Sequence, residues 1–244
     1  MSGEVSLNMI GQRKSQFDCR TREVSIDLPG ATLEGTLVLP NGTDGIVLFA
    51  HGSGSSRHSP RNRYVSEELN SNRIATLLFD LLTGEEESVD RYTGELRFDI
   101  AFLARRLVAA TQWVMNSPDT RELEIGYFGA STGAGAALVA AAELPGVISA
   151  VVSRGGRPDL AGNALGSVRA PTLLIVGGND EPVIGMNRYA LAKLSSPEKE
   201  LVIIPGATHL FEEPGTLEEV ARLAAAWFGE RFGINKPQAQ SEKR

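Results

Sequence analysis

The sequence predicts an α/β protein with a mostly parallel central sheet of about eight strands, an antiparallel hairpin at one edge and helices on both faces. Short, continuous apolar segments recur along the chain between turn-forming residues, which is typical of parallel strands buried on both faces. Segments with apolar residues at helical spacing lie between them. This alternation of strands and helices is that of a doubly wound sheet.

The predicted strands begin with an antiparallel pair. Residues 22–28 and 31–39 alternate between apolar and polar side chains around a Pro-Gly turn, which indicates a hairpin. The continuous apolar segments follow, and we expect them to form parallel strands. They are residues 45–50, 74–79, 123–128, 147–152, 172–177 and 200–205.

The clearest helix is predicted between residues 96 and 116, where apolar side chains recur at helical spacing. A later helix should begin at Thr216, because Glu219 follows three residues on, as in a capping box. Too few residues separate 152 from 172 to form a large cap domain over the sheet. We therefore expect an open site that takes small or extended soluble substrates.

These elements predict one domain at residues 20–233, between an N-terminal extension (1–19) and a flexible polar tail (234–244).

The formal net charge of −6 over 244 residues argues against a nucleic-acid partner. The chain has a single cysteine, Cys19, and neither a signal-like start nor a membrane-length apolar stretch. A cytoplasmic protein without a membrane partner is expected, and its oligomeric state stays open.

Polar residues that could form a catalytic site follow several predicted strands. In open α/β sheets, ligands bind outside the carboxyl ends of the strands. Ser131, Asp180 and His209 each follow a different strand, and this chain order is the one expected for an α/β hydrolase. The serine would be the nucleophile, the histidine its base, and the aspartate the group that orients the histidine.

The stretch GYFGASTGAGAAL around Ser131 should form a tight strand-to-helix turn, for which Gly129 and Gly133 leave room. Hydrolysis through a serine also requires backbone N–H donors for the oxyanion. We expect one donor from Thr132, which follows the nucleophile, and the other from Ser53 in the loop HGSGSS.

Some assignments stay open at this point. Glu181 and Asp159 are alternatives to Asp180 as the acid. His51 is expected to brace the oxyanion loop, and His58 lies on a loop that should reach the site. The same scaffold could also belong to a catalytically silent binding or sensor protein, or to an acyltransferase or amidase.

Five motifs together resemble the dienelactone hydrolase-like branch of the α/β-hydrolase superfamily, in which some proteins are joined to a phosphoribosyltransferase domain. The resemblance covers nearly the whole predicted domain and implies an α/β-hydrolase fold that cleaves a carboxylic ester, lactone or thioester through an acyl-enzyme. Dienelactone hydrolases have cysteine at the nucleophile position, where this chain has Ser131, so the resemblance implies the scaffold rather than dienelactone as substrate. The motifs are HGSGSSRHSPRNR, GYFGASTGAGAAL, VVSRGGRPDL, LLIVGGNDEPV and GATHLFEEPG.

Several cationic side chains lie on the loops that follow the predicted strands. Arg57, His58, Arg154 and Arg157 are candidates for binding a carboxylate or phosphate on a small-molecule substrate. The alternative for the arginines is a set of salt bridges to Glu85, Glu86 and Glu87. No Gly-Lys-Ser/Thr, GxGxxG or HExxH pattern occurs in the sequence, so no cofactor or metal is predicted.

Overall fold

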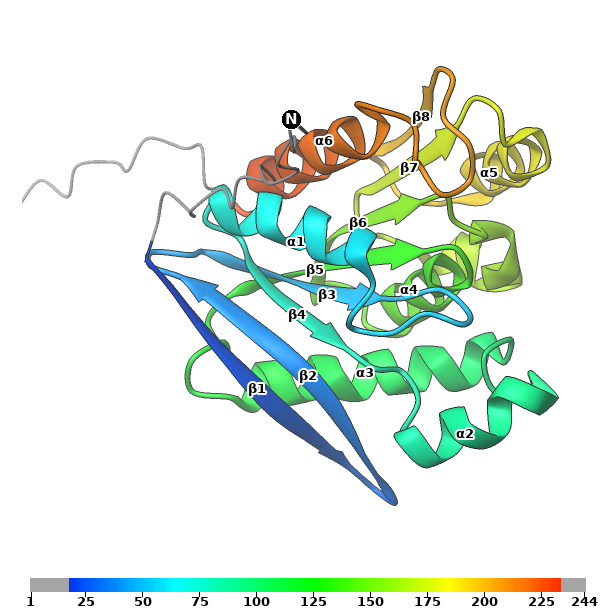
Figure 1. The fold of residues 1–244 in the computed structure, drawn as a ribbon. Coiled ribbons are helices and arrows are strands. Elements are labelled where there is room, and N and C mark those ends of the chain that lie inside the picture. The colour runs from blue at the N-terminus through cyan, green and yellow to red at the C-terminus, as the bar shows by residue number, and fades with distance from the viewer. Residues whose placement is uncertain (1–17, 234–244) are drawn as a thin grey trace, which may run out of the picture.

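The strands form one eight-stranded sheet in the order β1-β2-β4-β3-β5-β6-β7-β8 (Figure 1). The computed structural model describes residues 18–233. Strands β3 to β8 pair in parallel, and the antiparallel hairpin of β1 and β2 joins the sheet at β4, as predicted. The strands are β1 (Cys19–Leu28), β2 (Ala31–Pro40), β3 (Gly45–Ala50), β4 (Ala75–Phe79), β5 (Glu124–Ala130), β6 (Ile148–Arg154), β7 (Thr172–Gly177) and β8 (Lys199–Ile204).

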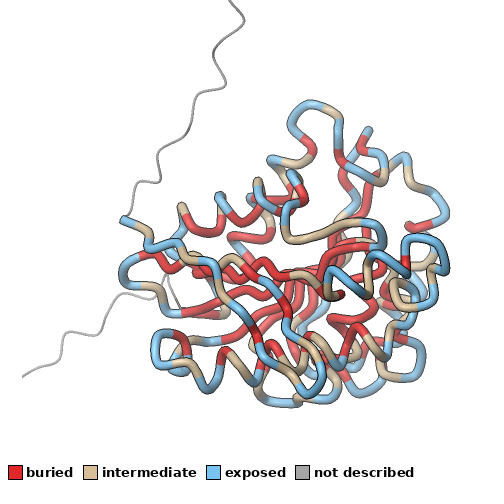
Figure 2. The backbone as a smooth tube through the Cα atoms, turned by 60° about the horizontal axis from the view of Figure 1, so that its bottom comes forward, coloured by how far each residue is buried: buried red, intermediate tan, exposed pale blue. Residues whose placement is uncertain are grey.

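Helices cover both faces of the sheet, and the buried residues concentrate between the layers (Figure 2). In strand β3, Ile46 and Leu48 join the core beneath α3, α4 and α5, whereas Val47 and Phe49 join the core beneath α1 and α6. Burial on both faces explains why this strand is apolar throughout. The helices are α1 (Pro60–Ser71), α2 (Gly84–Thr93), α3 (Ile100–Asn116), α4 (Thr132–Glu143), α5 (Glu181–Lys193), α6 (Thr216–Arg231) and the 3-10 helix η1 (Pro158–Ser167).

The capping box predicted at Thr216 is wrong. Helix α6 begins after Gly215, which has φ 84° and no side-chain cap, and the Thr216 hydroxyl donates instead to the backbone carbonyl of Glu213. A reciprocal capping box does form at α2, between Thr83 and Glu86. The pattern of residue types is the same in both places, and the path of the preceding loop decides which one becomes a cap.

Strands β5 and β6 extend two residues further than predicted. The added pairs in their parallel register are Gly129 with Ser153 and Ala130 with Arg154. Small and charged residues had marked these positions as the start of loops. The longer strands place Arg154 directly beside the residue that precedes Ser131.

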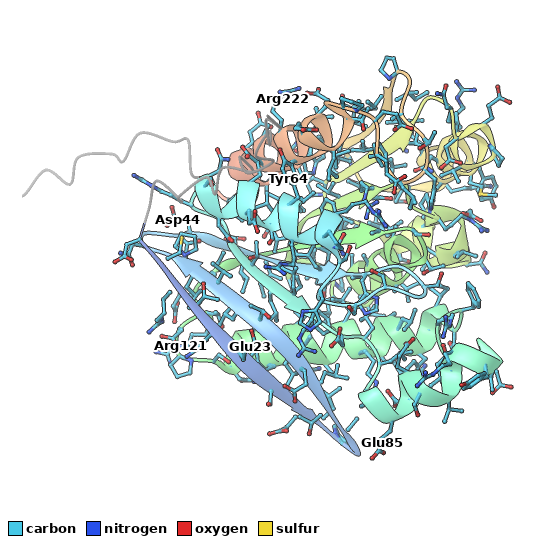
Figure 3. The ribbon with its side chains drawn as sticks, viewed as in Figure 1. Glu23, Asp44, Tyr64, Glu85, Arg121 and Arg222 are labelled. Carbon is cyan, nitrogen blue, oxygen red and sulfur yellow. The ribbon has the colours of Figure 1, made fainter. Side chains whose placement is uncertain are left out.

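The connection between β6 and β7 contains η1 and carries no large cap, as predicted. Charged side chains such as Glu85, Arg121 and Arg222 lie on the outside of the molecule (Figure 3). Within residues 18–233, no helix combines the length and apolar character needed to cross a bilayer.

Candidate active site

Ser131 lies on the tight turn between β5 and α4. Its backbone has φ 50° and ψ −123°, a conformation that side chain-bearing residues rarely adopt. The neighbouring glycines permit this turn. A Cβ atom on Gly133 would lie 2.1 Å from the carbonyl oxygen of Ala50, and one on Gly129 would lie 2.5 Å from the Cα of Ala134. Ser131 therefore stands at the start of a helix, on a turn that packs against β3.

Asp180 is the carboxylate that contacts His209. The Nδ1 atom of His209 lies 2.7 Å from the Oδ2 atom of Asp180, whose side chain is 12% exposed. The carboxylate can only accept, so we assign the proton to Nδ1, which leaves Nε2 of the imidazole as a proton acceptor. The alternative acids lie elsewhere: Asp159 binds Arg157, and Glu181 is exposed at the start of α5.

Ser131 and His209 both pack against the end of β6. The N–H of Ser131 donates to the carbonyl of Arg154 at 3.3 Å. A Cβ atom on the next residue, Gly155, would lie 3.0 Å from the carbonyl oxygen of His209 and 3.7 Å from its Cε1. Among the described residues, the Ser131 hydroxyl has no hydrogen-bond partner. In resting enzymes, bonds between nucleophile and base are often long and tighten only when substrate binds.

The two predicted oxyanion residues are in direct contact. The N–H of Ser53 donates to the side-chain Oγ1 of Thr132 at 2.9 Å. A Cβ atom on Gly52 would lie 3.0 Å from the Cβ of Ser131, so the loop passes directly over the nucleophile. The sequence had pointed to the backbone N–H of Thr132, and the side-chain contact was missed because nothing local indicates it.

The His51 side chain holds the oxyanion loop in place through two hydrogen bonds. Its Nε2 accepts from the N–H of Leu81 at 3.0 Å, and its Nδ1 lies 3.0 Å from the carbonyl oxygen of Gly52. The first bond requires an unprotonated Nε2, so we assign the proton to Nδ1. Burial lowers the pKa of His51, although the Gly52 carbonyl and the charges of Asp80 and Glu87 oppose the shift. The ring is therefore a neutral support for the loop.

Two of the candidate substrate-binding arginines have carboxylate partners within the protein. The backbone N–H of Arg57 donates to Asp80 at 2.7 Å, and its guanidinium pairs with the same carboxylate and lies 3.9 Å from Glu23. Arg157 binds both oxygens of Asp159, at 2.8 and 2.9 Å. These bonds to the carboxylate raise the pKa of Arg157. These two side chains are held by salt bridges.

Those salt bridges differ from the pairs that the sequence suggested. Glu86 and Glu87 pair with Arg106 and Arg97, from the segments that follow α2 along the chain. Asp80, which binds Arg57, follows a different strand, whereas Asp159 lies two residues after Arg157 in the same segment. Spacing along the sequence could not reveal the pair of Arg57 and Asp80, because that contact depends on how two loops fold against each other.

Arg154, unlike Arg57 and Arg157, has no carboxylate partner among the described residues. Its side chain is buried (6% exposed), and its Nη2 donates to the amide oxygen of Asn62 at 3.2 Å. The ring of Phe211 lies 6.0 Å away. Within residues 18–233, no acceptor is found for Nε and no carboxylate forms an ion pair with the guanidinium. Burial and the charge of Arg61 lower the pKa of Arg154 to about 10, so the group is still a cation at neutral pH.

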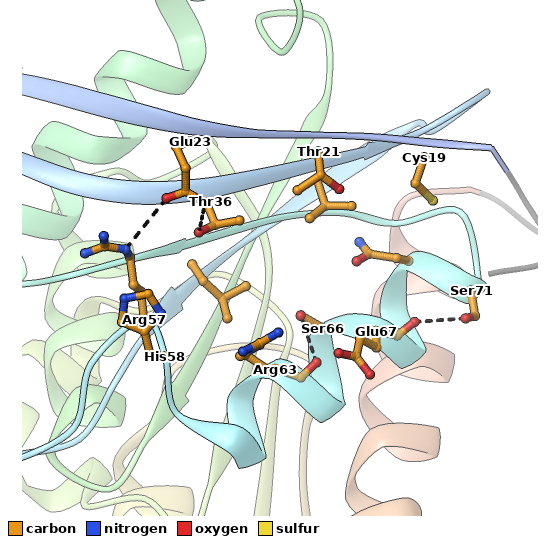
Figure 4. A pocket seen from close by; sticks show the side chains of 13 residues that line it. Cys19, Thr21, Glu23, Thr36, Arg57, His58, Arg63, Ser66, Glu67 and Ser71 are labelled. Carbon is orange, nitrogen blue, oxygen red and sulfur yellow. Dashed lines mark hydrogen bonds and ion pairs between the residues drawn. The ribbon is translucent and has the colours of Figure 1, made fainter. Parts of the chain in front are cut away.

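A cavity of about 490 Å³ lies between the β1–β2 hairpin and helix α1 (Figure 4). Its lining includes Arg57, His58 and Arg63, together with the carboxylates of Glu23 and Glu67. Neither Ser131 nor His209 lines it. The structure therefore places the exposed His58 in a groove that is separate from the nucleophile.

A second cavity, of about 330 Å³, borders the oxyanion loop. His51, Gly54 and Ser55 form one side of it, and Thr83 and Gly84 at the start of α2 form the other. Neither Ser131 nor His209 is among the residues that line this second cavity, so it adjoins the oxyanion loop but does not mark the position of the nucleophile.

The chain matches known hydrolases over most of its length. The model of the dienelactone hydrolase family matches residues 51–231. A crystal structure of a dienelactone hydrolase from Anabaena variabilis is 62% identical, with a TM-score of 0.85, and the match covers 87% of this chain and 98% of that one. The esterase domain of a Rhodothermus marinus protein, 20% identical with a TM-score of 0.69 over 88% of this chain and all of that domain, shares the fold.

Two proteins from Mycobacterium tuberculosis strains, CDC 1551 and H37Rv, are 59% identical over 210 residues. Both carry the provisional name of phosphoribosyl transferase. The match covers 86% of this chain and 46% of each relative, so the chain spans about half the length of these curated relatives.

Proposed function

The chain belongs to the dienelactone hydrolase family, and from this premise we propose that it is a serine hydrolase that cleaves a small carboxylic ester, lactone or thioester. The observation that carries the proposal is the bond of 2.7 Å between His209 and Asp180, next to a strained turn that presents Ser131. An imidazole held by a carboxylate, beside a serine on a strand-to-helix turn, is the arrangement that activates a hydroxyl nucleophile.

The proposed reaction proceeds in two halves. Ser131 attacks the carbonyl carbon while His209 takes the hydroxyl proton on Nε2, and the Asp180 carboxylate stabilises the imidazolium. The oxyanion binds at the junction of the Ser53 loop and the start of α4. The intermediate collapses, the alcohol leaves with the proton from His209, and an acyl-enzyme remains on Ser131. Water then repeats the sequence and releases the acid.

A fluorophosphonate probe tests this proposal. We expect the folded protein to react with the probe stoichiometrically at Ser131, as located by mass spectrometry of the labelled peptide, because the probe reacts only with an activated serine. The variant Ser131→Ala should stay folded and take up no label. Folded wild-type protein that fails to react would favour a catalytically silent binding protein on the same scaffold.

The unpaired charge of Arg154 supports a substrate that carries an anionic group. A buried cation without a counter-ion is unfavourable, and Arg57 and Arg157 are paired with carboxylates. The backbone carbonyl of Arg154 accepts from the N–H of Ser131, and its guanidinium lies 6.0 Å from the ring of Phe211, two residues after His209. A carboxylate or phosphate on the substrate would supply the missing charge and could bind the guanidinium through two hydrogen bonds.

Arg154→Met should separate this role from a structural one. Methionine keeps much of the volume and removes the buried charge, so the free energy of unfolding should be unchanged or higher. We expect KM for an anionic ester to rise about 10- to 100-fold, the loss of a charged hydrogen bond, while KM for the matching neutral ester stays within a few-fold. Arg157→Met is the matched control and should not discriminate between the two esters. Equal effects of Arg154→Met on both esters would refute the anionic substrate.

A further inference from the structure

The Ser53 N–H already has an acceptor in the resting protein. It donates to the Thr132 hydroxyl oxygen at 2.9 Å, and the Thr132 side chain belongs to a residue that is only 5% exposed. Within the described part of the chain, no acceptor is found for the proton of this hydroxyl. We infer that the Thr132 hydroxyl is itself an oxyanion donor, polarised by the Ser53 N–H. This inference rests on the proposed hydrolase function.

Both backbone segments around the bond are fixed. On the loop side, the ring of His51 bonds to the carbonyl of Gly52 and to the N–H of Leu81. On the helix side, Gly133 packs so closely against β3 that a Cβ atom there would lie 2.6 Å from the carbonyl oxygen of His51. The Ser53 N–H therefore has little freedom to turn away from Thr132, whereas the hydroxyl proton can rotate about its C–O bond.

The chemistry favours a chain of two hydrogen bonds. When negative charge develops on the substrate oxygen, the hydroxyl of Thr132 donates to it and continues to accept from Ser53. Hydrogen bonds from a hydroxyl to an anion are short and strong, and a donor that is itself polarised by an N–H group is strengthened further. Thr132 would then offer two donors to the oxyanion, its backbone N–H and its hydroxyl, both held in place before the reaction starts.

Two substitutions at Thr132 test the inference. Thr132→Val keeps the shape and removes the hydroxyl, and we expect it to lower kcat about 100-fold with little change in KM, as for the loss of one oxyanion donor. Thr132→Ser keeps a hydroxyl and should stay within a few-fold of the wild type. Should the valine variant fail to fold, Thr132→Ala replaces it, with the same expected loss.

Thr120→Val is a matched control. The Thr120 hydroxyl is also buried, and it donates to the carbonyl of Val114 at 2.7 Å, in the turn that follows α3. Its loss should lower the melting temperature and leave kcat unchanged. A drop in kcat for this variant equal to that of Thr132→Val would overturn the inference, because any buried hydroxyl would then have the same effect.

A thionoester substrate gives a second readout. Sulfur is a poor hydrogen-bond acceptor, so wild-type protein should lose much of its kcat when the carbonyl oxygen is replaced, and Thr132→Val should lose far less. With the ordinary ester, a kcat of Thr132→Val equal to or above that of the wild type would overturn the inference, because the hydroxyl would then block the oxyanion site. The fluorophosphonate reaction of wild-type protein at Ser131 distinguishes that result from a failure of the hydrolase proposal itself.

Discussion

Asp180→Asn is expected to lower kcat about 10⁴-fold without unfolding the protein, an effect typical of losing the carboxylate that orients a catalytic histidine. The Asp180 carboxylate accepts the Nδ1 proton of His209. An amide at this position can donate to Nδ1 instead, which places the proton on Nε2, the atom that must accept from Ser131. Steady-state kinetics with an ester substrate, alongside circular dichroism of the variant, would measure both effects.

Asp159→Asn is the matched control for this substitution. Asp159 follows the neighbouring strand and was one of the two alternative acids, but it binds Arg157. The change should cost stability through the lost ion pair and leave kcat within a few-fold of the wild type. If Asp159→Asn lost as much activity as Asp180→Asn, the assignment of Asp180 would be wrong.

Gly133→Ala adds one methyl group beside the site, and we expect this substitution to destabilise the fold strongly. The new Cβ would lie 2.1 Å from the carbonyl oxygen of Ala50 and 2.6 Å from that of His51. These are backbone atoms of β3 and its end, so no side-chain rotation relieves the clash and α4 must move away from the strand. We expect the free energy of unfolding to fall by about 3 kcal/mol or more, measured by urea unfolding, with loss of probe labelling at Ser131.

Gly185→Ala in helix α5 is the matched control, a glycine with room for a methyl group. A Cβ atom on Gly185 meets nothing within 4 Å, and the residue lies inside α5. Alanine favours the helix over glycine by about 1 kcal/mol, so this variant should be more stable than the wild type. A Gly133→Ala variant as stable as Gly185→Ala would contradict the close packing of α4 against β3.

The fold could be predicted from the sequence because strands β3 to β7 are buried along almost their whole length and are separated by segments with helical patterns. Val47 and Phe49 face one core while Ile46 and Leu48 face the other, so the whole strand had to be apolar. The boundaries were harder to predict. Strand β6 continues to Arg154, whose charge was taken as the start of a loop, and the cap at Thr216 failed because the loop before it supplies Gly215 instead.

The candidate site divides in the same way. The candidate residues Ser131, Asp180 and His209 could be proposed from the sequence because each follows its own strand, and parallel strands bring their carboxyl ends together. The side chains that bind Arg57 and Arg154 could not be predicted in this way. Arg57 pairs with Asp80 and Arg154 contacts Asn62, and these pairs join loops and helices whose mutual packing no local pattern encodes.

The short connection between β6 and β7 has a kinetic consequence. Within residues 18–233 this connection holds only η1, so no domain inserted there has to swing aside when substrate enters or product departs. Many enzymes are limited in turnover by such opening motions. If the proposed reaction is limited by chemistry, kcat/KM, which reports formation of the acyl-enzyme, should respond to the electronic character of the leaving group rather than to solvent viscosity.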